Sequence, residues 1–152
     1  MTRQTILVDI DHTLSAAWHR DGMIGGEGGW DAYHAASSED DPIHDVMALI
    51  NSLATGLDDW YIIALTARPE KWRSVTTEWL IKHSIFVDEI LMRPDEAFHP
   101  APEIKVQLAQ ERFPGDQLKD NVAFLIEDRE DVCEAFHQLG ITTLQVKGRQ
   151  NG

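Results

Sequence analysis

Short apolar runs alternate with helical segments along this 152-residue chain, and that alternation limits the folds it can form. Runs of this length that end in polar or turn residues are typical of buried strands. They cover residues 5–8, 60–65, 89–92, 121–126 and 142–146. Strands that alternate with helices pair in parallel, with helices on both faces of the sheet. We therefore expect an α/β fold, a Rossmann-like, doubly wound parallel sheet of about five strands.

The segments between these runs carry apolar residues at helical spacing. Asp41 followed by Pro42 predicts an N-cap and a first helical position, and Gly140 predicts a helix end. The predicted helices cover residues 42–55, 69–80, 102–113 and 132–139.

Residues 15–41 interrupt the alternation. They show little periodicity and are rich in glycine between Gly22 and Gly29. A segment of this length is too short for a second domain. We expect one domain over residues 1–152, with no large cap domain and a flexible, Gly-rich, flap-like insertion at residues 15–41.

Composition narrows the classes of protein and partner. Thirteen basic residues against 26 acidic ones give a formal charge of -13, which repels nucleic acid at long range unless a local patch overrides it. The single cysteine, Cys133, excludes an intramolecular disulfide framework. No apolar run is long enough to suggest a membrane span or a signal peptide. We expect a cytoplasmic protein with a small substrate and no membrane partner.

Polar residues gather where the predicted strands end. In open parallel sheets ligands lie outside the carboxyl ends of the strands. The residues predicted at that edge are Asp9 and Asp11, Thr66, and Glu127 with Asp128. Lys105, in the first turn of a predicted helix, is a candidate to join them.

This set of side chains suits phosphate chemistry with a metal ion. A carboxylate about 3 Å from a phosphate charge meets a repulsion of roughly 5 kcal/mol at an effective dielectric constant near 20. Asp9 therefore needs a hard divalent cation, which Asp9, Asp11 and Asp128 could hold, and Mg²⁺ fits an all-oxygen site. Lys105 would add positive charge, and the Thr66 hydroxyl would orient phosphoryl oxygens.

The order of these motifs resembles that of the haloacid dehalogenase (HAD) superfamily of phosphatases over nearly the whole chain. The matching positions are Asp9 to Thr13, Thr66, Lys105, and Glu127 with Asp128. The resemblance implies that Asp9 becomes an aspartyl phosphate, while Asp11 protonates the leaving oxygen and later deprotonates water. It also implies Mg²⁺, with Asp9, the backbone carbonyl of Asp11 and Asp128 as ligands and Glu127 as a further candidate.

Two tetrapeptides sharpen the resemblance. Residues 65–68 and 126–129 are similar to motifs of the 3′-phosphatase domain of bacteriophage polynucleotide kinase and related deoxynucleotidases. This makes Arg68 a candidate substrate contact. Two positions depart from the superfamily pattern: His12 stands where glycine is frequent, and Glu127 replaces the first of two usual aspartates.

Within the insertion, Arg20 and Trp30 are the candidates for substrate binding. Arg20 could hold a phosphate and Trp30 could stack on a base, although aromatic residues in such loops more often anchor the loop to its own domain.

The predicted function is a Mg²⁺-dependent phosphomonoesterase, nucleotidase or polynucleotide 3′-phosphatase, acting on nucleotides or nucleic-acid 3′-phosphate ends. Two alternatives remain. A signalling receiver domain uses similar groups, but its acceptor aspartate follows the third strand and its lysine the fifth. A phosphate-binding module without turnover is the other, suggested by Glu127 and His12.

Overall fold

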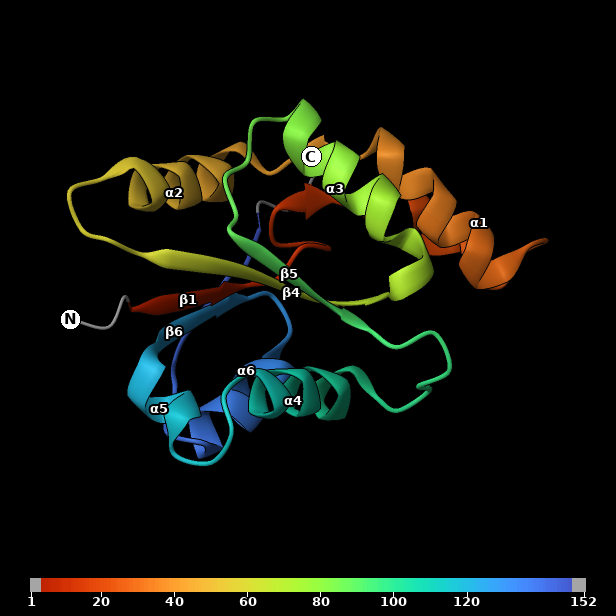
Figure 1. Ribbon diagram of the computed structural model, residues 1–152. Coiled ribbons are helices and arrows are strands. Elements are labelled where there is room, and N and C mark those ends of the chain that lie inside the picture. The colour runs from red at the N-terminus through yellow and green to blue at the C-terminus, as the bar shows by residue number, and fades with distance from the viewer. Residues whose placement is uncertain (1–3, 149–152) are drawn as a thin grey trace.

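A single parallel sheet forms the centre of the molecule in the computed structural model, which describes residues 4–148 (Figure 1). Its strands are β1 (Thr5–Val8), β4 (Tyr61–Pro69), β5 (Glu89–Arg93), β6 (Val122–Glu127) and β7 (Thr142–Gln145). They lie in the order β5-β4-β1-β6-β7, and all neighbours pair in parallel. The predicted α/β sheet is confirmed.

The strand order also decides between two parallel architectures. Counted along the chain, the strands of the sheet lie in the order 3-2-1-4-5. That is the Rossmann-like order, whereas receiver domains of the flavodoxin-like type have the order 2-1-3-4-5. The receiver alternative is therefore wrong for this fold.

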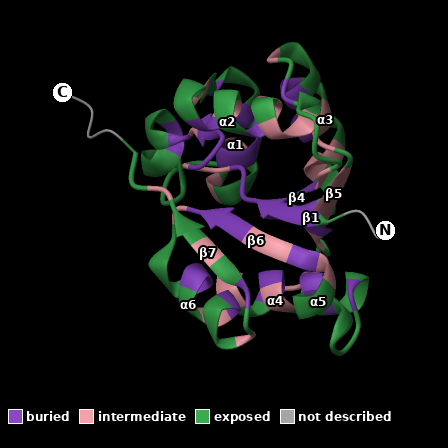
Figure 2. Ribbon diagram, turned by 90° about the vertical axis from the view of Figure 1, so that its left-hand side faces the viewer, coloured by how far each residue is buried: buried purple, intermediate pink, exposed green. Residues whose placement is uncertain are grey.

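Helices cover both faces of the sheet (Figure 1). They are α2 (His44–Thr55) and α3 (Arg73–Lys82) on one face, and α4 (Ala101–Arg112), α5 (Gln117–Asn121) and α6 (Glu130–Gln138) on the other. Because side chains alternate along a strand, Ile6 and Val8 pack toward α2 and α3 while Leu7 packs toward α4 and α6. Figure 2 shows the central strands buried and the edge strand β7 largely exposed.

The insertion forms short elements of its own. They are β2 (Ser15–Ala16), η1 (Trp18–Met23), α1 (Gly29–Ala35), η2 (Ala36–Glu39) and β3 (Asp41–Pro42). β2 and β3 pair as a two-stranded antiparallel ribbon, and the Trp79 indole on α3 donates a 2.8 Å hydrogen bond to the Asp40 carbonyl. None of these elements is long enough to show a period in the sequence. Movement of this segment as a flap stays a prediction.

Two predicted helix starts are wrong by a few residues. Helix α2 begins at His44 because Asp41 and Pro42 pair with Ala16 and Ser15 as strand β3. Strand β4 continues to Pro69, which pairs with Arg93, so the 3₁₀ helix η3 (Glu70–Trp72) precedes α3. Over residues 4–148, none of the helices combines the length and the apolar character that crossing a bilayer requires.

Candidate active site

The predicted site residues meet at the carboxyl edge of the sheet. Asp9 follows β1 and Asp128 follows β6, and these neighbouring strands flank the point where the strand order reverses direction. The Asp9 backbone amide donates a 2.9 Å hydrogen bond to the Ile126 carbonyl, which holds the two strand ends together. Such a reversal opens a crevice in which ligands of parallel α/β sheets bind.

Asp9 lies at the centre of a group that we call the Asp9 cluster, formed by the buried residues Asp9, Thr13, Lys105 and Glu127 and the half-buried Asp128. The Lys105 ammonium lies 2.7 Å from Asp9 Oδ1 and 2.6 Å from Glu127 Oε2. The Thr13 hydroxyl lies 2.8 Å from Asp9 Oδ2 and 3.2 Å from Asp128 Oδ1. Each Asp9 oxygen is thus held by a different donor.

The Asp9 cluster carries more negative than positive charge. Burial lowers the pKa of Lys105, but Asp9 and Glu127 outweigh that effect and raise it, so the ammonium stays charged. Burial, with the charge of Asp9, raises the pKa of Glu127 against the attraction of Lys105. Burial and contact with Asp9 raise the pKa of Asp128 to about 6. One ammonium does not neutralise three close carboxylates.

That excess of negative charge fits a divalent cation. Carboxylate oxygens of Asp9, Glu127 and Asp128 lie within 4.8 Å of one another, close enough to share one ion. Oxygen-only donors with room for water and substrate suit Mg²⁺. Glu127 reaches this group although its Oε2 contacts Lys105 and its Oε1 accepts a 3.2 Å hydrogen bond from the Arg129 backbone amide.

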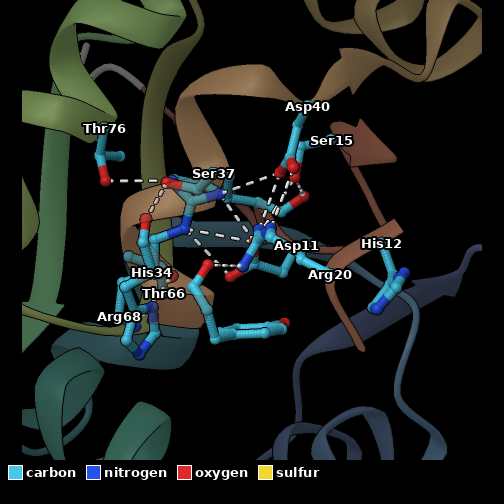
Figure 3. Close-up of polar contacts among 12 residues, drawn as sticks. Asp11, His12, Ser15, Arg20, His34, Ser37, Asp40, Thr66, Arg68 and Thr76 are labelled. Atoms are coloured by element: carbon cyan, nitrogen blue, oxygen red, sulfur yellow. Dashed lines mark hydrogen bonds and ion pairs between the residues drawn. The ribbon is translucent and has the colours of Figure 1, made fainter. Parts of the chain in front are cut away.

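Asp11 belongs to a second group, the Asp11 cluster, formed by Asp11, Arg20, Asp40, Arg68 and Thr76 (Figure 3). Arg68 Nη2 lies 2.7 Å from Asp11 Oδ1, and its Nε lies 3.0 Å from Oδ2. Arg20 Nη2 also contacts Asp11 Oδ1, and it lies 2.8 Å from Asp40 Oδ2. Arg68 Nη1 donates to the Thr76 hydroxyl at 3.1 Å. Both guanidiniums are buried.

The two arginines hold Asp11 in its ionised form. Burial by itself raises the pKa of Asp11, but the attraction of Arg68 and Arg20 outweighs burial and holds the pKa well below its usual range. An ionised carboxylate can accept a proton from water. Donation of a proton to a leaving group requires protonated Asp11, which these two ion pairs oppose.

A cleft of about 620 Å³ opens over both clusters. The predicted residues that line it are Asp9, Asp11, Trp30, Thr66, Arg68, Lys105 and Asp128. Arg20 and Glu127 do not line it and lie behind these residues. The Thr66 hydroxyl accepts a 3.1 Å hydrogen bond from the Arg68 backbone amide, at the cleft wall. Cavities of this size bind small molecules up to the size of a nucleotide or larger.

A family model described as polynucleotide kinase PNKP phosphatase domain matches residues 3–150, almost the entire chain. The chain belongs to this family of phosphatases. The family lies within the HAD superfamily, so the resemblance predicted from the motifs is confirmed. A comparison with curated protein sequences gives no match.

Solved structures agree on the fold of this PNKP-type phosphatase domain. A chain of the Pnkp1/Rnl/Hen1 complex is 24% identical with a TM-score of 0.79; the match covers 96% of this chain and 47% of that one. The phosphatase domain thus spans about half the length of that relative. A HAD-like hydrolase from Streptococcus pneumoniae is 16% identical with a TM-score of 0.67, and the match covers 95% and 85% of the two chains. A HAD enzyme from Bacteroides thetaiotaomicron, in complex with magnesium and inorganic phosphate, is 14% identical with a TM-score of 0.59, and the match covers 99% and 97%.

The structure explains the preference for glycine at position 12. His12 has φ 63°, in the left-handed region that glycine adopts without strain. Its imidazole Nε2 lies 3.1 Å from Asp21 Oδ1, and its ring centroid lies 5.0 Å from that of Trp18. These contacts with η1 join the motif to the insertion.

Three residues of the two clusters, Thr13, Asp40 and Thr76, were not predicted as site residues from the sequence. Thr13 contacts Asp9, and its place directly after the two aspartates was an available signal. Asp40 pairs with Arg20, and no spacing or motif marks it. Arg68 lines the cleft as predicted, but its guanidinium is engaged by Asp11 and Thr76, so a substrate contact by Arg68 stays a prediction.

Proposed function

We propose that the chain is a Mg²⁺-dependent phosphomonoesterase that forms an aspartyl phosphate at Asp9 and acts on nucleotides or nucleic-acid 3′-phosphate ends. The observation that carries this proposal is the position of Asp9. It is a buried carboxylate at the end of the central strand, held by Lys105 and Thr13, and it lines the cleft. A nucleophile placed this way can attack a phosphate that is bound in line with it, once a cation offsets the repulsion between the two anions.

The proposed reaction has two steps. In the first, which requires Asp11 in its protonated form, a carboxylate oxygen of Asp9 bonds to phosphorus, the bond to the leaving alcohol breaks, and the alcohol oxygen takes the proton from Asp11. In the second, water gives a proton to Asp11, the water oxygen bonds to phosphorus, and the bond to Asp9 breaks to release inorganic phosphate. Lys105 and the Thr66 hydroxyl bind phosphoryl oxygens in both steps.

Asp9, Asp128 and the backbone carbonyl of Asp11 would hold the metal ion, with Glu127 as a further candidate. Bound Mg²⁺ supplies the positive charge that lets an anionic carboxylate approach an anionic phosphate. The charge excess of the Asp9 cluster supports this assignment.

A nucleic-acid end or nucleotide is the substrate class that the comparisons favour. The family takes its name from a polynucleotide kinase, and one structural relative, 24% identical, is described as part of an RNA repair complex. The open cleft leaves room for a group larger than phosphate. A cytoplasmic location remains part of the proposal.

A phosphate-release screen in the presence of Mg²⁺ tests the proposal. It compares 5′- and 3′-mononucleotides, 3′-phosphorylated oligonucleotides and sugar phosphates. We expect the nucleotide-based substrates to be preferred. A clear preference for sugar phosphates would overturn the substrate class.

A phosphate-binding module without turnover is the second candidate, and the two ion pairs of Asp11 favour it because they disfavour proton donation. An aryl phosphate, whose leaving group needs little protonation, distinguishes the two functions. Rapid Mg²⁺-dependent hydrolysis that a chelator abolishes would exclude the binding module.

A further inference from the structure

One cation of the cleft differs from the others in its partners. Four of the lysines and arginines that line the cleft have a carboxylate partner within ion-pair distance: Arg68 with Asp11, Lys71 with Asp31, Lys105 with Asp9 and Glu127, and Arg129 with Asp131. Within residues 4–148, Arg93 at the end of β5 has no such ion pair. Its Nε donates to the Ala67 carbonyl at 2.9 Å and its Nη1 to the Ala97 carbonyl at 2.6 Å.

The contacts of Arg93 orient its guanidinium without neutralising it. Carbonyl oxygens are neutral acceptors, so the full positive charge remains beside the cleft. The nearest candidate in sequence, Asp95, accepts a 2.9 Å hydrogen bond from the Lys71 backbone amide instead. A guanidinium held in place, half-buried and uncompensated is suited to bind a phosphate group.

Two exposed aromatic side chains line the same cleft. Trp30 on α1 is 58% exposed, and Phe98 in the loop between β5 and α4 is 85% exposed. One face of Trp30 stacks on His34, with ring centroids 5.9 Å apart and an interplanar angle of 24°. The Arg93 guanidinium lies 5.8 Å from the centre of the Phe98 ring. Because both rings border the cleft and are exposed, they are available to stack on a further part of a substrate.

The two aromatic residues come from separate parts of the fold. In Figure 1, α1 and the loop between β5 and α4 lie on the same side of the molecule, beyond the carboxyl ends of the strands and on opposite sides of the sheet plane. Trp30 therefore belongs to the insertion wall of the cleft and Phe98 to the opposite wall.

We propose that Trp30, Phe98 and Arg93 form a nucleotide subsite, in which the two rings stack on bases of a single-stranded 3′ end and Arg93 binds the phosphodiester that precedes the terminal nucleotide. This inference rests on the proposed phosphatase function and adds the residues that would read a strand rather than a mononucleotide. A formal charge of -13 disfavours long-range attraction of a strand, so stacking and one local cation must supply its affinity.

The test measures kcat/KM for a 3′-phosphorylated hexathymidylate, thymidine 3′-monophosphate and p-nitrophenyl phosphate, each with Mg²⁺. The wild-type chain should prefer the oligonucleotide to the mononucleotide. Trp30→Ala and Phe98→Ala should each lower the ratio of oligonucleotide to aryl phosphate kcat/KM by about 5- to 150-fold, the range for loss of one stacked base. Phe86→Ala, at an exposed ring outside the cleft, is the matched control and should leave the ratio unchanged.

Salt dependence tests Arg93. Each phosphate contact on a single strand contributes a slope of about -0.7 to log K against log salt concentration. With Asp9→Asn as the non-reacting background, fluorescence anisotropy of the labelled hexathymidylate should show that Arg93→Gln reduces the steepness of that slope by about 0.7. Arg93→Lys keeps the charge and should restore the slope. Arg112→Gln, outside the cleft, should leave it unchanged.

Two outcomes would overturn the subsite. In one, the wild type does not prefer the oligonucleotide to the mononucleotide. In the other, the Trp30 and Phe98 variants leave the ratio of oligonucleotide to aryl phosphate kcat/KM unchanged, because both activities stay the same or fall equally. The proposed function fails in a different way, by the absence of Mg²⁺-dependent hydrolysis of every phosphomonoester, aryl phosphate included. The anisotropy measurement then still decides whether the cleft binds a strand.

Discussion

Asp9 and Asp11 are two residues apart in the chain, yet they lie in opposite charge environments. In the Asp9 cluster three carboxylates share one ammonium, that of Lys105. In the Asp11 cluster two carboxylates meet two guanidiniums, those of Arg20 and Arg68. The first cluster therefore carries an excess of negative charge, whereas the charges of the second cluster are balanced.

The difference indicates which part of the site needs an added ion. Buried charges are stable only when paired, so the excess carboxylates of the Asp9 cluster call for a cation, while the Asp11 cluster is complete without one. In the proposed mechanism Asp9 binds the metal ion and attacks phosphorus, whereas the side chain of Asp11 is held by the guanidiniums of Arg20 and Arg68. The predictions below change the charge of one cluster or, for His34, of a group beside the Asp11 cluster.

The largest expected effect comes from Asp9→Asn. The amide cannot attack phosphorus, so phosphate release should fall by about a thousandfold or more, to the background rate. The fold should persist, because the change removes one charge from a cluster with excess negative charge. Phosphate release and the far-ultraviolet circular dichroism spectrum check the two parts, and retained turnover would contradict the nucleophile assignment.

Removal of metal comes next. A chelator should abolish hydrolysis, and added Mg²⁺ should restore it. Because a ligand that binds only the folded state stabilises it, Mg²⁺ at about 100 times its Kd should raise the free energy of unfolding by about 2.7 kcal/mol. Asp128→Asn should reduce the Mg²⁺ affinity by about tenfold or more.

Thermal unfolding with and without Mg²⁺ provides a readout of metal binding that does not depend on activity. Asp131→Asn is the matched control, because Asp131 pairs with Arg129 on the surface and lies outside the acidic group. A Tm that responds to Mg²⁺ equally in both variants would argue against Asp128 as a ligand.

The contribution of the Asp11 cluster to the free energy of unfolding should depend on the balance of its charges and not on a bound metal ion. Arg20→Gln leaves Asp40 buried with a weakened partner set, and breaking a buried pair costs about 3–5 kcal/mol of unfolding free energy. The double variant Arg20→Gln/Asp40→Asn restores the balance and should be more stable than the sum of the single changes predicts. Urea unfolding measures this coupling, and simple additivity would show that balance is not what stabilises the cluster.

His34 gives the smallest effect. Burial, with the nearby positive charges of Arg68, Arg20 and Arg93, lowers the pKa of His34 to about 4, against the opposing charge of Asp11. Since the pKa is lower in the folded state, the stability contribution is complete above about pH 6.5 and is lost as the pH falls from 6.5 toward 4.

The free energy of unfolding of the wild type should therefore fall more between pH 7 and pH 5 than that of His34→Gln. We expect a difference on the order of 1 kcal/mol, after allowance for solvent screening. Urea unfolding at the two pH values measures it. Equal slopes for both chains would mean that His34 titrates normally.

The strand ends were predictable, and the reason is geometric. Period-two burial places Asp9 at the end of a strand, and parallel pairing brings Thr66 and Asp128 to the same edge. The prediction that Lys105 belongs to the site also needed the family resemblance, because a lysine in a helical turn is not by itself evidence of a functional role. The family match confirms the fold and the phosphatase class that these residues implied.

The Asp11 cluster could not be predicted in the same way. Arg20 and Asp40 lie in a segment without periodicity, and their contact with each other and with Asp11 depends on how short elements pack in three dimensions. Arg68 was predicted to face substrate, but the distance to Asp11 that decides its partner is a tertiary quantity.

The β2–β3 ribbon has a consequence for how such phosphatases diversify. It joins Ser15 to Pro42, so the segment between them leaves and re-enters the domain at adjacent points. Its length and composition can therefore change during evolution without displacing the sheet that carries Asp9. Arg20 limits which segments could replace this one, because a replacement must still place a guanidinium beside Asp11.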